Sequence, residues 1–181
     1  MKTRWIVSAF IALIAYAGLA VAQEPEEISK VEVFGGYSLL RSDGHNFNGW
    51  KTAVDFNVNR WLSIAADVSG NYYSESTPTG KLKESEYAFT VGPHFVMRSK
   101  SKFVPFVYAM PGVAWENTSH PGRSESRSGF AFEAGGGLDW EVTKKVSIRL
   151  FDLTASTTRI DGHTTTKPKF ATGFIFHFGK K

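Results

Sequence analysis

Ten ionisable side chains of this sequence fall at alternate positions within otherwise apolar segments. They are Glu32, Lys51, Asp55, Asp67, His94, Arg98, Glu133, Asp139, Arg149 and His177. Residues two apart on a β-strand point to the same face of a sheet, so these groups would share one polar face. Opposite charges on such a face can form ion pairs or can simply be solvated, and the spacing leaves both possibilities open.

The histidines and hydroxyl groups form no recognisable catalytic or metal-binding arrangement. The five histidines are scattered along the chain, whereas a metal site needs ligands at a defined spacing. Ser119 directly precedes His120, but in a polar stretch that is typical of a turn. We therefore predict no catalytic, cofactor-binding or metal-ligating residue and expect that the protein is not an enzyme.

The elements that would position the polar face are β-strands. Apolar and polar residues alternate with a period of two in eight segments, and no segment after the first residues has a strong helical period. One side of most segments is aromatic or aliphatic, and the other carries the ionisable groups. The eight segments are 30–40, 50–58, 62–72, 87–98, 103–115, 130–140, the segment beginning at 146, and 169–181.

Two of the predicted strands depart from simple alternation. Segment 103–115 is apolar on both sides and contains Pro105 and Pro111, which cannot donate a ladder hydrogen bond, so its phase stays open. In the strand that begins at Val146, the alternation slips near Phe151, which predicts a β-bulge.

The connections between these segments alternate in length. Long polar connections ("RSDGHNF", "SESTPTGKLKE", "ENTSHPGRSESR" and "TRIDGHTTTKP") follow the odd-numbered strands, and short ones ("NR", "SKSK" and "VTKK") follow the even-numbered strands. In an antiparallel up-and-down barrel, this order places every long connection at one end. Short turns at one end and long loops at the other are typical of outer-membrane barrels.

The distribution of large side chains indicates which face meets lipid. An eight-stranded barrel has room only for side chains that just fill it, so the bulky residues fit better outside. Most segments run about 9–11 residues, enough for a tilted strand to cross a bilayer. Aromatic residues at the strand ends are expected at the membrane interfaces, and here they are Trp50, Trp61, Tyr72, Tyr87 and Trp140.

The N-terminal residues predict export. Lys2 and Arg4 precede the apolar run "WIVSAFIALIAYA", and Ala20 and Ala22 have the spacing of a cleavage site, so residues 1–22 are a predicted signal peptide and residues 23–181 the barrel domain. Without Lys2 and Arg4, the 21 basic residues fall to 19 against 17 acidic ones. No block of like charge remains to follow a phosphate backbone, so we expect no nucleic-acid partner.

The mature chain resembles the eight-stranded outer-membrane barrel family that includes the OmpA transmembrane domain and OmpX. The resemblance rests on the signal peptide, the "VFGGY" that opens the first strand, the alternating connections and the aromatic final strand. Gly173, Phe176 and Phe178 resemble the assembly signal of this family. Two features depart from it: Ala171 stands where a polar residue is usual, and the last aromatic is followed by 179–181.

This resemblance implies an all-β fold, an eight-stranded antiparallel up-and-down transmembrane β-barrel in the bacterial outer membrane. It implies a monomer without cofactor, in contact with outer-membrane lipid, lipopolysaccharide and the barrel-assembly machinery, with a possible extracellular ligand on the long loops. Some barrels of this size are lipid A deacylases with a His-x-Ser pair, and no histidine here has serine two residues on.

Strand register predicts specific neighbours. If the turn between the sixth and seventh strands centres on Lys144, Asp139 lies opposite Arg149, with Trp140 opposite Ile148 and Leu138 opposite Leu150. Where the last strand closes onto the first, Glu32 and His177 lie at the same end and could pair.

We expect a structural or surface-interaction role with a packed polar interior and exposed loops. A small gated pore is an alternative, with Lys51, Asp67, Glu133 and Arg149 as gate candidates. A secreted lipocalin-like barrel is a further alternative.

Overall fold

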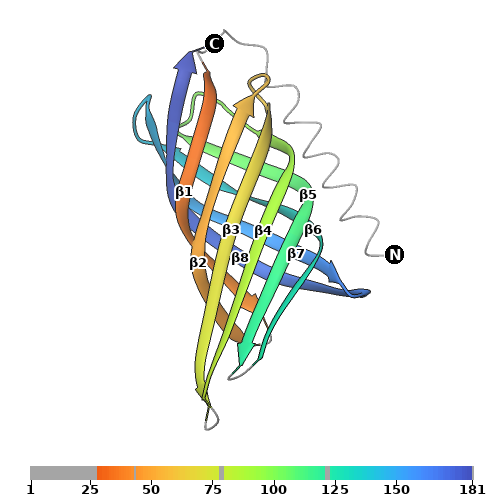
Figure 1. Ribbon diagram of the computed structural model, residues 1–181. Helices are drawn as coiled ribbons and strands as arrows, with labels where there is room; N and C mark the ends of the chain where they lie inside the picture. The colour runs from red at the N-terminus through yellow and green to blue at the C-terminus, as the bar shows by residue number, and fades with distance from the viewer. Residues whose placement is uncertain (1–27, 43, 78–79, 121–122, 181) are drawn as a thin grey trace, which may run out of the picture.

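A computed structural model describes residues 28–180 except 43, 78–79 and 121–122. Eight antiparallel strands form a closed barrel in chain order, and β1 pairs with β8 (Figure 1). The strands are β1 Ser29–Ser42, β2 His45–Asn57, β3 Leu62–Thr77, β4 Gly80–Val96, β5 Phe103–His120, β6 Arg123–Glu141, β7 Val146–Ile160 and β8 His163–Lys180. The predicted all-β up-and-down barrel is confirmed. The predicted signal peptide 1–22 lies outside the described residues and stays a prediction.

The barrel has two distinct ends. The terminal end holds the start of β1, the end of β8 and the turns 58–61, 97–102 and 142–145. The hairpin end holds the tips of the β1–β2, β3–β4, β5–β6 and β7–β8 hairpins. No helix within the described residues is long and apolar enough to cross a membrane.

The prediction of long loops at the hairpin end is wrong. The polar segments continue the strands, which run from 13 residues in β2 to 19 in β6 rather than about 9–11. Only a few residues remain at each tip, and Asp161 and Gly162 both have positive φ angles, as a tight hairpin turn requires. Alternating Ser and Thr residues suit a solvated strand as well as a loop, which is why their polarity misled the prediction.

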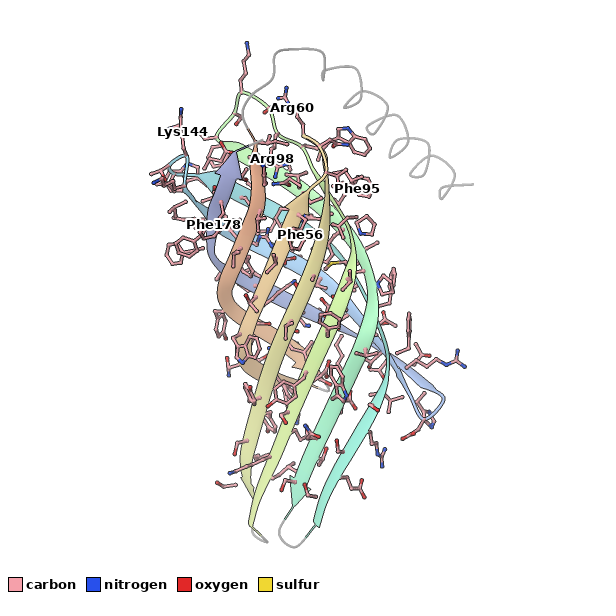
Figure 2. The ribbon with its side chains drawn as sticks, turned by 45° about the horizontal axis from the view of Figure 1, so that its top comes forward. Phe56, Arg60, Phe95, Arg98, Lys144 and Phe178 are labelled. Atoms are coloured by element: carbon pink, nitrogen blue, oxygen red, sulfur yellow. The ribbon has the colours of Figure 1, made fainter. Side chains whose placement is uncertain are left out.

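The outer wall of the barrel is aromatic, as the alternation predicts. Exposed rings gather near each end, and Figure 2 shows Phe56, Phe95 and Phe178 on the wall at the terminal end. We call Phe56, Trp61, Phe95, Phe103, Trp140 and Phe178 the terminal-end belt, and Tyr37, Trp50, Tyr72, Tyr87 and Trp115 the hairpin-end belt. Three residues of the hairpin-end belt are in contact, since the Trp50 Nε1–H donates to the Tyr72 hydroxyl at 3.2 Å and Tyr72 meets Tyr87 edge-on.

The structure shows which residues of β5 point into the barrel, a question that the sequence leaves open. Phe106, Tyr108 and Met110 point into the barrel and are almost fully buried, whereas Val107 and Trp115 are exposed on the wall. Two large aromatic rings therefore fill interior space. They fit because the facing positions of β6 are Gly135 and Gly137, where an added Cβ would come within 2.7 Å of Tyr108 or Phe106 atoms.

The predicted bulge is confirmed in β7. The β6–β7 register shifts between Leu138 and Asp139, and the β7–β8 register shifts between Arg149 and Asp152. Asp139 faces Arg149 and Trp140 faces Ile148 as predicted, but Leu138 pairs with Phe151 and not with Leu150. The extra residue accounts for this error, and it also turns Asp152 inward.

Candidate functional site

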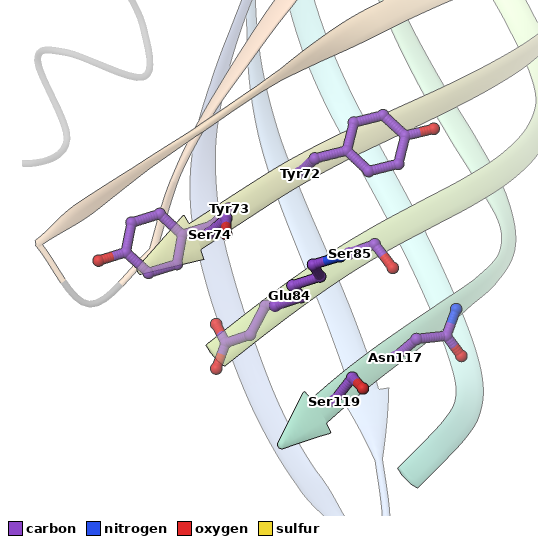
Figure 3. Close-up of a pocket in the computed structure, with 8 residues that line it drawn as sticks. Tyr72, Tyr73, Ser74, Glu84, Ser85, Asn117 and Ser119 are labelled. Atoms are coloured by element: carbon purple, nitrogen blue, oxygen red, sulfur yellow. The ribbon is translucent and has the colours of Figure 1, made fainter. Parts of the chain in front are cut away.

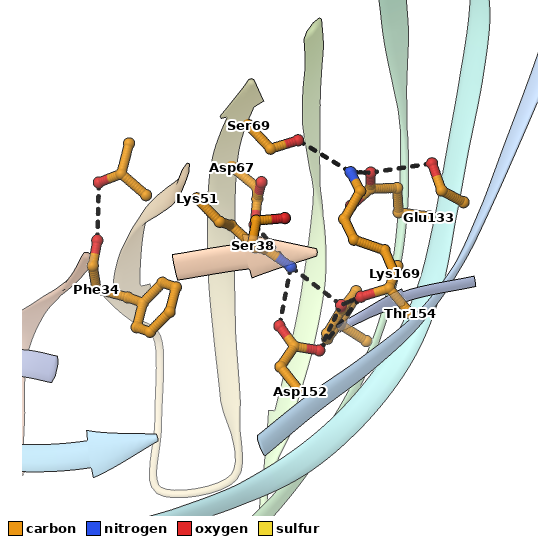
Figure 4. Close-up of polar contacts among 12 residues, drawn as sticks. Phe34, Ser38, Lys51, Asp67, Ser69, Glu133, Asp152, Thr154 and Lys169 are labelled. Carbon is orange, nitrogen blue, oxygen red and sulfur yellow. Dashed lines mark hydrogen bonds and ion pairs between the residues drawn. The ribbon is translucent and has the colours of Figure 1, made fainter. Parts of the chain in front are cut away.

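The middle of the barrel holds a charge network around Lys51 on β2. Its Nζ donates to the Asp152 Oδ2 at 2.8 Å and lies 3.2 Å from the Asp67 Oδ2, with the Tyr108 hydroxyl also at 3.2 Å (Figure 4). The Tyr108 hydroxyl donates in turn to the Asp152 Oδ1 at 2.8 Å and bonds Thr154. Four strands therefore meet around one ammonium group.

A second pair lies beside this network. The Lys169 Nζ contacts the Glu133 Oε1 at 2.6 Å and the Ser69 hydroxyl at 2.9 Å, and Ser156 donates to the same Glu133 oxygen (Figure 4). The side chains of Lys169 and Glu133 are 1% and 0% exposed, so solvent does not screen the pair.

Arg149 on β7 fills the barrel toward the terminal end. Its Nε and one terminal nitrogen bond the two oxygens of Asp139 at 2.8 and 3.0 Å. The guanidinium carbon lies 4.6 Å from the Phe34 ring centre and 4.1 Å from that of Phe106. A planar cation between two rings gains both electrostatic and packing contacts, which ammonium cannot reproduce.

The terminal end closes the interior with a smaller network. The Glu32 Oε1 accepts from Arg98 at 2.7 Å and lies 3.5 Å from the His177 Nδ1, so the predicted Glu32–His177 contact is confirmed. The other ring nitrogen of His177 bonds the Ser147 hydroxyl at 2.7 Å. His94 and Asp55 form a separate buried pair between this network and Arg149.

Near the hairpin end, Lys167 on β8 bridges two carboxylates. Its Nζ lies 2.5 Å from Glu86 and 2.8 Å from Glu116, and its side chain is 11% exposed. Charge pairs therefore recur along the length of the barrel interior, from Lys167 near the hairpin end to Glu32 at the terminal end.

The structure places the nine interior candidates in three groups. Lys51, Asp67 and Glu133 belong to the middle networks, and Glu32 and His177 form the terminal-end group. Between these two groups lie Asp55, His94, Asp139 and Arg149. Among the pore-gate candidates, Arg149 approaches the Lys51 network only through Asp152, at 3.8 Å.

Sequence reasoning missed several interior residues of equal weight. Asp152 was missed because the bulge changes which residues of β7 point inward. Tyr108 was missed because β5 is apolar on both faces, so its inward positions could not be identified from alternation. Lys169 continues the inward positions of β8 two residues before Ala171, so extending that alternation would have found it. Lys167 stood in a stretch read as a loop.

Residues of the predicted assembly signal lie at the closing seam between β8 and β1. Phe176 and Phe178 are exposed on the wall and pair with Val33 and Val31. A Cβ on Gly173 would lie 2.4 Å from the Gly35 carbonyl oxygen, so the seam itself requires glycine there. The assembly role of these three residues stays a prediction.

The outer surface of the extended hairpins carries a shallow cavity of about 390 Å³. Residues of β3, β4 and β5 line it, and Figure 3 shows their hydroxyl, carboxylate and amide groups around it. Tyr72 of the hairpin-end belt forms the edge farthest from the hairpin tips, and Ser119 lies toward the β5 tip. The accessible lining of the cavity is mostly apolar, with a few hydrogen-bonding groups beside the Tyr72 ring.

Comparison with known proteins places the chain among outer-membrane β-barrels. A family model described as the outer membrane protein beta-barrel domain matches residues 8–179. No curated protein sequence matches the chain.

Solved structures with this fold share little sequence with the chain. The attachment invasion locus protein Ail of Yersinia pestis, solved with the heparin analogue sucrose octasulfate, is 19% identical, covering 84% of this chain and 100% of Ail with a TM-score of 0.55. Neisserial surface protein A is 14% identical over 82% of this chain and 96% of its own, with a TM-score of 0.60. OprG of Pseudomonas aeruginosa is 10% identical over 85% and 98%, with a TM-score of 0.55.

Proposed function

The chain belongs to the outer membrane protein β-barrel family, and we propose that it is a sealed surface barrel whose extended hairpins bind an extracellular ligand. Its location is the bacterial outer membrane, which confirms the membrane prediction over the secreted lipocalin-like alternative. In such barrels the short turns face the periplasm, so the terminal end is periplasmic and the hairpin end is outside.

The observation that carries this proposal is the length of the hairpins. β3 continues five residues past Tyr72 to Thr77, and β5 continues five residues past Trp115 to His120. Because the hairpin-end belt marks the outer membrane interface, these extensions stand in the aqueous phase. Paired strands hold a surface in a fixed shape, which lowers the ordering cost of binding a ligand.

The charge networks support a barrel that does not conduct. Lys51, Asp152, Lys169 and Glu133 fill the middle with side chains at most 1% exposed. Planar-bilayer recordings test this directly against the gated-pore alternative. We expect no discrete conductance steps from the purified barrel, and regular steps would favour the pore.

Ail was solved with a heparin analogue, which makes heparin a reasonable first probe for the ligand. The cavity supports a glycan-type ligand, because its hydroxyl, amide and tyrosine groups are the kinds that bind sugars. We also propose contact with lipopolysaccharide around the hairpin-end belt, a monomeric state and no enzymatic activity.

Binding to cells that display the protein tests the proposal. The matched variant replaces residues 74–83 with a two-residue turn, which removes the extended β3–β4 hairpin with the cavity-lining residues Ser74 and Lys83 and leaves the belt intact. We expect the intact protein to retain cells on immobilised heparin or extracellular matrix and the variant to lose at least half of that retention. If the intact protein retains no cells on either surface, or the variant retains as many, the binding role is wrong.

For assembly, we propose that Phe178 acts in recognition by the barrel-assembly machinery. Phe174 is an ideal control, because it lies on the same face of β8 and is equally exposed at 54%. We expect Phe178→Ala to reduce the folded, heat-modifiable form in outer membranes severalfold and Phe174→Ala to leave it nearly unchanged. Equal losses would mean that lipid contact alone explains the effect.

A further inference from the structure

The terminal end displays a set of exposed lysines on its turns. Lys100 and Lys102 lie in turn 97–102, and Lys144 and Lys145 lie in turn 142–145. We call these four residues the lysine rim. Within the described part of the chain, none of the four forms an ion pair with another residue.

Backbone hydrogen bonds hold the lysine rim in place. The Lys102 carbonyl accepts the Glu141 N–H at 2.8 Å, and the Lys145 carbonyl accepts the His177 N–H at 3.0 Å. The Lys145 N–H donates to the Thr143 hydroxyl at 3.2 Å. Both turns are therefore tied to neighbouring strands, and only the side chains of the rim need to adapt to a partner.

The height of the rim relative to the membrane follows from the terminal-end belt. Trp61 stacks on Phe95 with ring centres 6.0 Å apart, and Trp140 pairs with Phe103 across β5 and β6. Figure 2 shows Arg60 and Lys144 beyond the belt residues Phe56, Phe95 and Phe178. Because aromatic belts mark the interface, cations just beyond the belt lie at the depth of lipid headgroups.

Within residues 28–180, as far as the structure describes them, acidic side chains at the terminal end do not balance the rim. Glu32 is engaged inside the barrel by Arg98 and His177. Glu141 directly precedes turn 142–145, and its backbone N–H bonds the Lys102 carbonyl, so one carboxylate stands beside four rim lysines. An excess of positive charge therefore remains on the two turns 97–102 and 142–145 among the residues that the structure describes.

We propose that the lysine rim binds the phosphates of anionic phospholipids, of the phosphatidylglycerol class, in the periplasmic leaflet. A zwitterionic lipid places its own cation beside its phosphate, whereas an anionic headgroup offers net negative charge to the lysines. The rim thereby selects the lipids around one end of the barrel, independently of any ligand on the hairpins.

Native tryptophans supply the reporters for the test. In the mature chain with Trp50→Phe and Trp115→Phe, the remaining tryptophans, Trp61 and Trp140, lie at the terminal end. Brominated acyl chains quench tryptophan fluorescence on contact. Two vesicle mixtures of phosphatidylcholine and phosphatidylglycerol are compared, one with the phosphatidylglycerol brominated and one with the phosphatidylcholine brominated. The ratio of quenching in the two mixtures reports which lipid is preferred at this belt. We expect phosphatidylglycerol to be preferred about threefold, and the preference to disappear at about 1 M salt, where the screening length is about 3 Å.

Charge removal then identifies the rim as the cause. Replacing all four rim lysines with glutamine should bring the relative quenching close to one. The matched control removes four exposed charges from the other end: Arg41→Gln, Lys83→Gln, Arg127→Gln and Arg159→Gln. It should leave the preference at Trp61 and Trp140 unchanged.

Three results would overturn the proposal: equal quenching by both lipids in the parent protein, a preference that survives loss of the rim, or an equal loss in the control. Heat-modifiable migration verifies that each variant is folded. The salt series on the parent protein tests the proposal even if the rim variant fails to fold.

Discussion

The buried pairs around Lys51 and the exposed pairs around Arg127 both join a basic side chain to carboxylates, but in different surroundings. Lys51 meets Asp152 at 2.8 Å with side chains 1% and 0% exposed, and Arg127 meets Glu125 at 3.2 Å with side chains 59% and 38% exposed. Water and salt screen the second pair but hardly reach the first. Burial, more than distance, should therefore decide what each pair contributes.

Lys167 occupies the middle of this range. Its partner Glu86 is buried, while its other partner, Glu116, is 35% exposed. The barrel thus contains a graded series of charge pairs, and one substitution at each level tests whether the effect follows burial.

The largest effect is expected for Lys51→Met. Asp67 and Asp152 would lose their shared partner in a dry interior, which should lower the free energy of unfolding by about 3–5 kcal/mol. Urea unfolding in phospholipid vesicles, followed by tryptophan fluorescence, measures it. The double variant with Asp152→Asn should recover part of the loss, and a loss below about 1 kcal/mol for Lys51→Met alone would contradict the burial argument.

Arg149→Lys keeps the charge but removes the paired geometry. Lysine cannot bond both Asp139 oxygens in parallel or lie flat between Phe34 and Phe106, so we expect a loss of about 1.5–3 kcal/mol. The same unfolding assay applies. A lysine variant as stable as the parent would show that charge alone matters at this position.

Lys167→Met should have an intermediate effect of about 1–2 kcal/mol, between the exposed and buried limits. Water can reach Glu116 and solvate it after the substitution, but it reaches Glu86 less easily. Measuring the free energy of unfolding at two salt concentrations separates the contributions of the two ion pairs. Only the contribution of the solvated Lys167–Glu116 pair should weaken with salt.

Arg127→Gln should change stability by less than about 1 kcal/mol, and the change should shrink further in high salt. Its partners Glu125 and Asp161 remain solvated on the hairpins. An effect as large as that of Lys51→Met would break the comparison, because burial would no longer separate the two pairs.

The sequence predicted the fold well because alternation records which face each residue uses. The inward positions of β2, β3 and β6 followed from that pattern, including Lys51, Asp67 and Glu133. A bulge breaks this logic, since one inserted residue reverses every later side chain of the strand. Asp152 is therefore the interior partner that alternation could not supply.

Pairing across the barrel was predictable only between strands adjacent in sequence or at closure. Asp139–Arg149 and Glu32–His177 are neighbours in the register, so counting residues found them. Lys51 and Asp152 come from β2 and β7, which are not neighbours in the sheet and share no backbone ladder. Such contacts depend on barrel diameter and side-chain length, which no local pattern records.

The seam between β1 and β8 has a consequence for how the protein folds. Ser29 and His177, which meet there, are 148 positions apart in the chain. Every other strand pair joins a hairpin of near neighbours, which can form early, whereas this pairing must wait for the whole chain. Until then both terminal strands are open edges that can recruit foreign strands, so a nascent barrel needs protection at this one place.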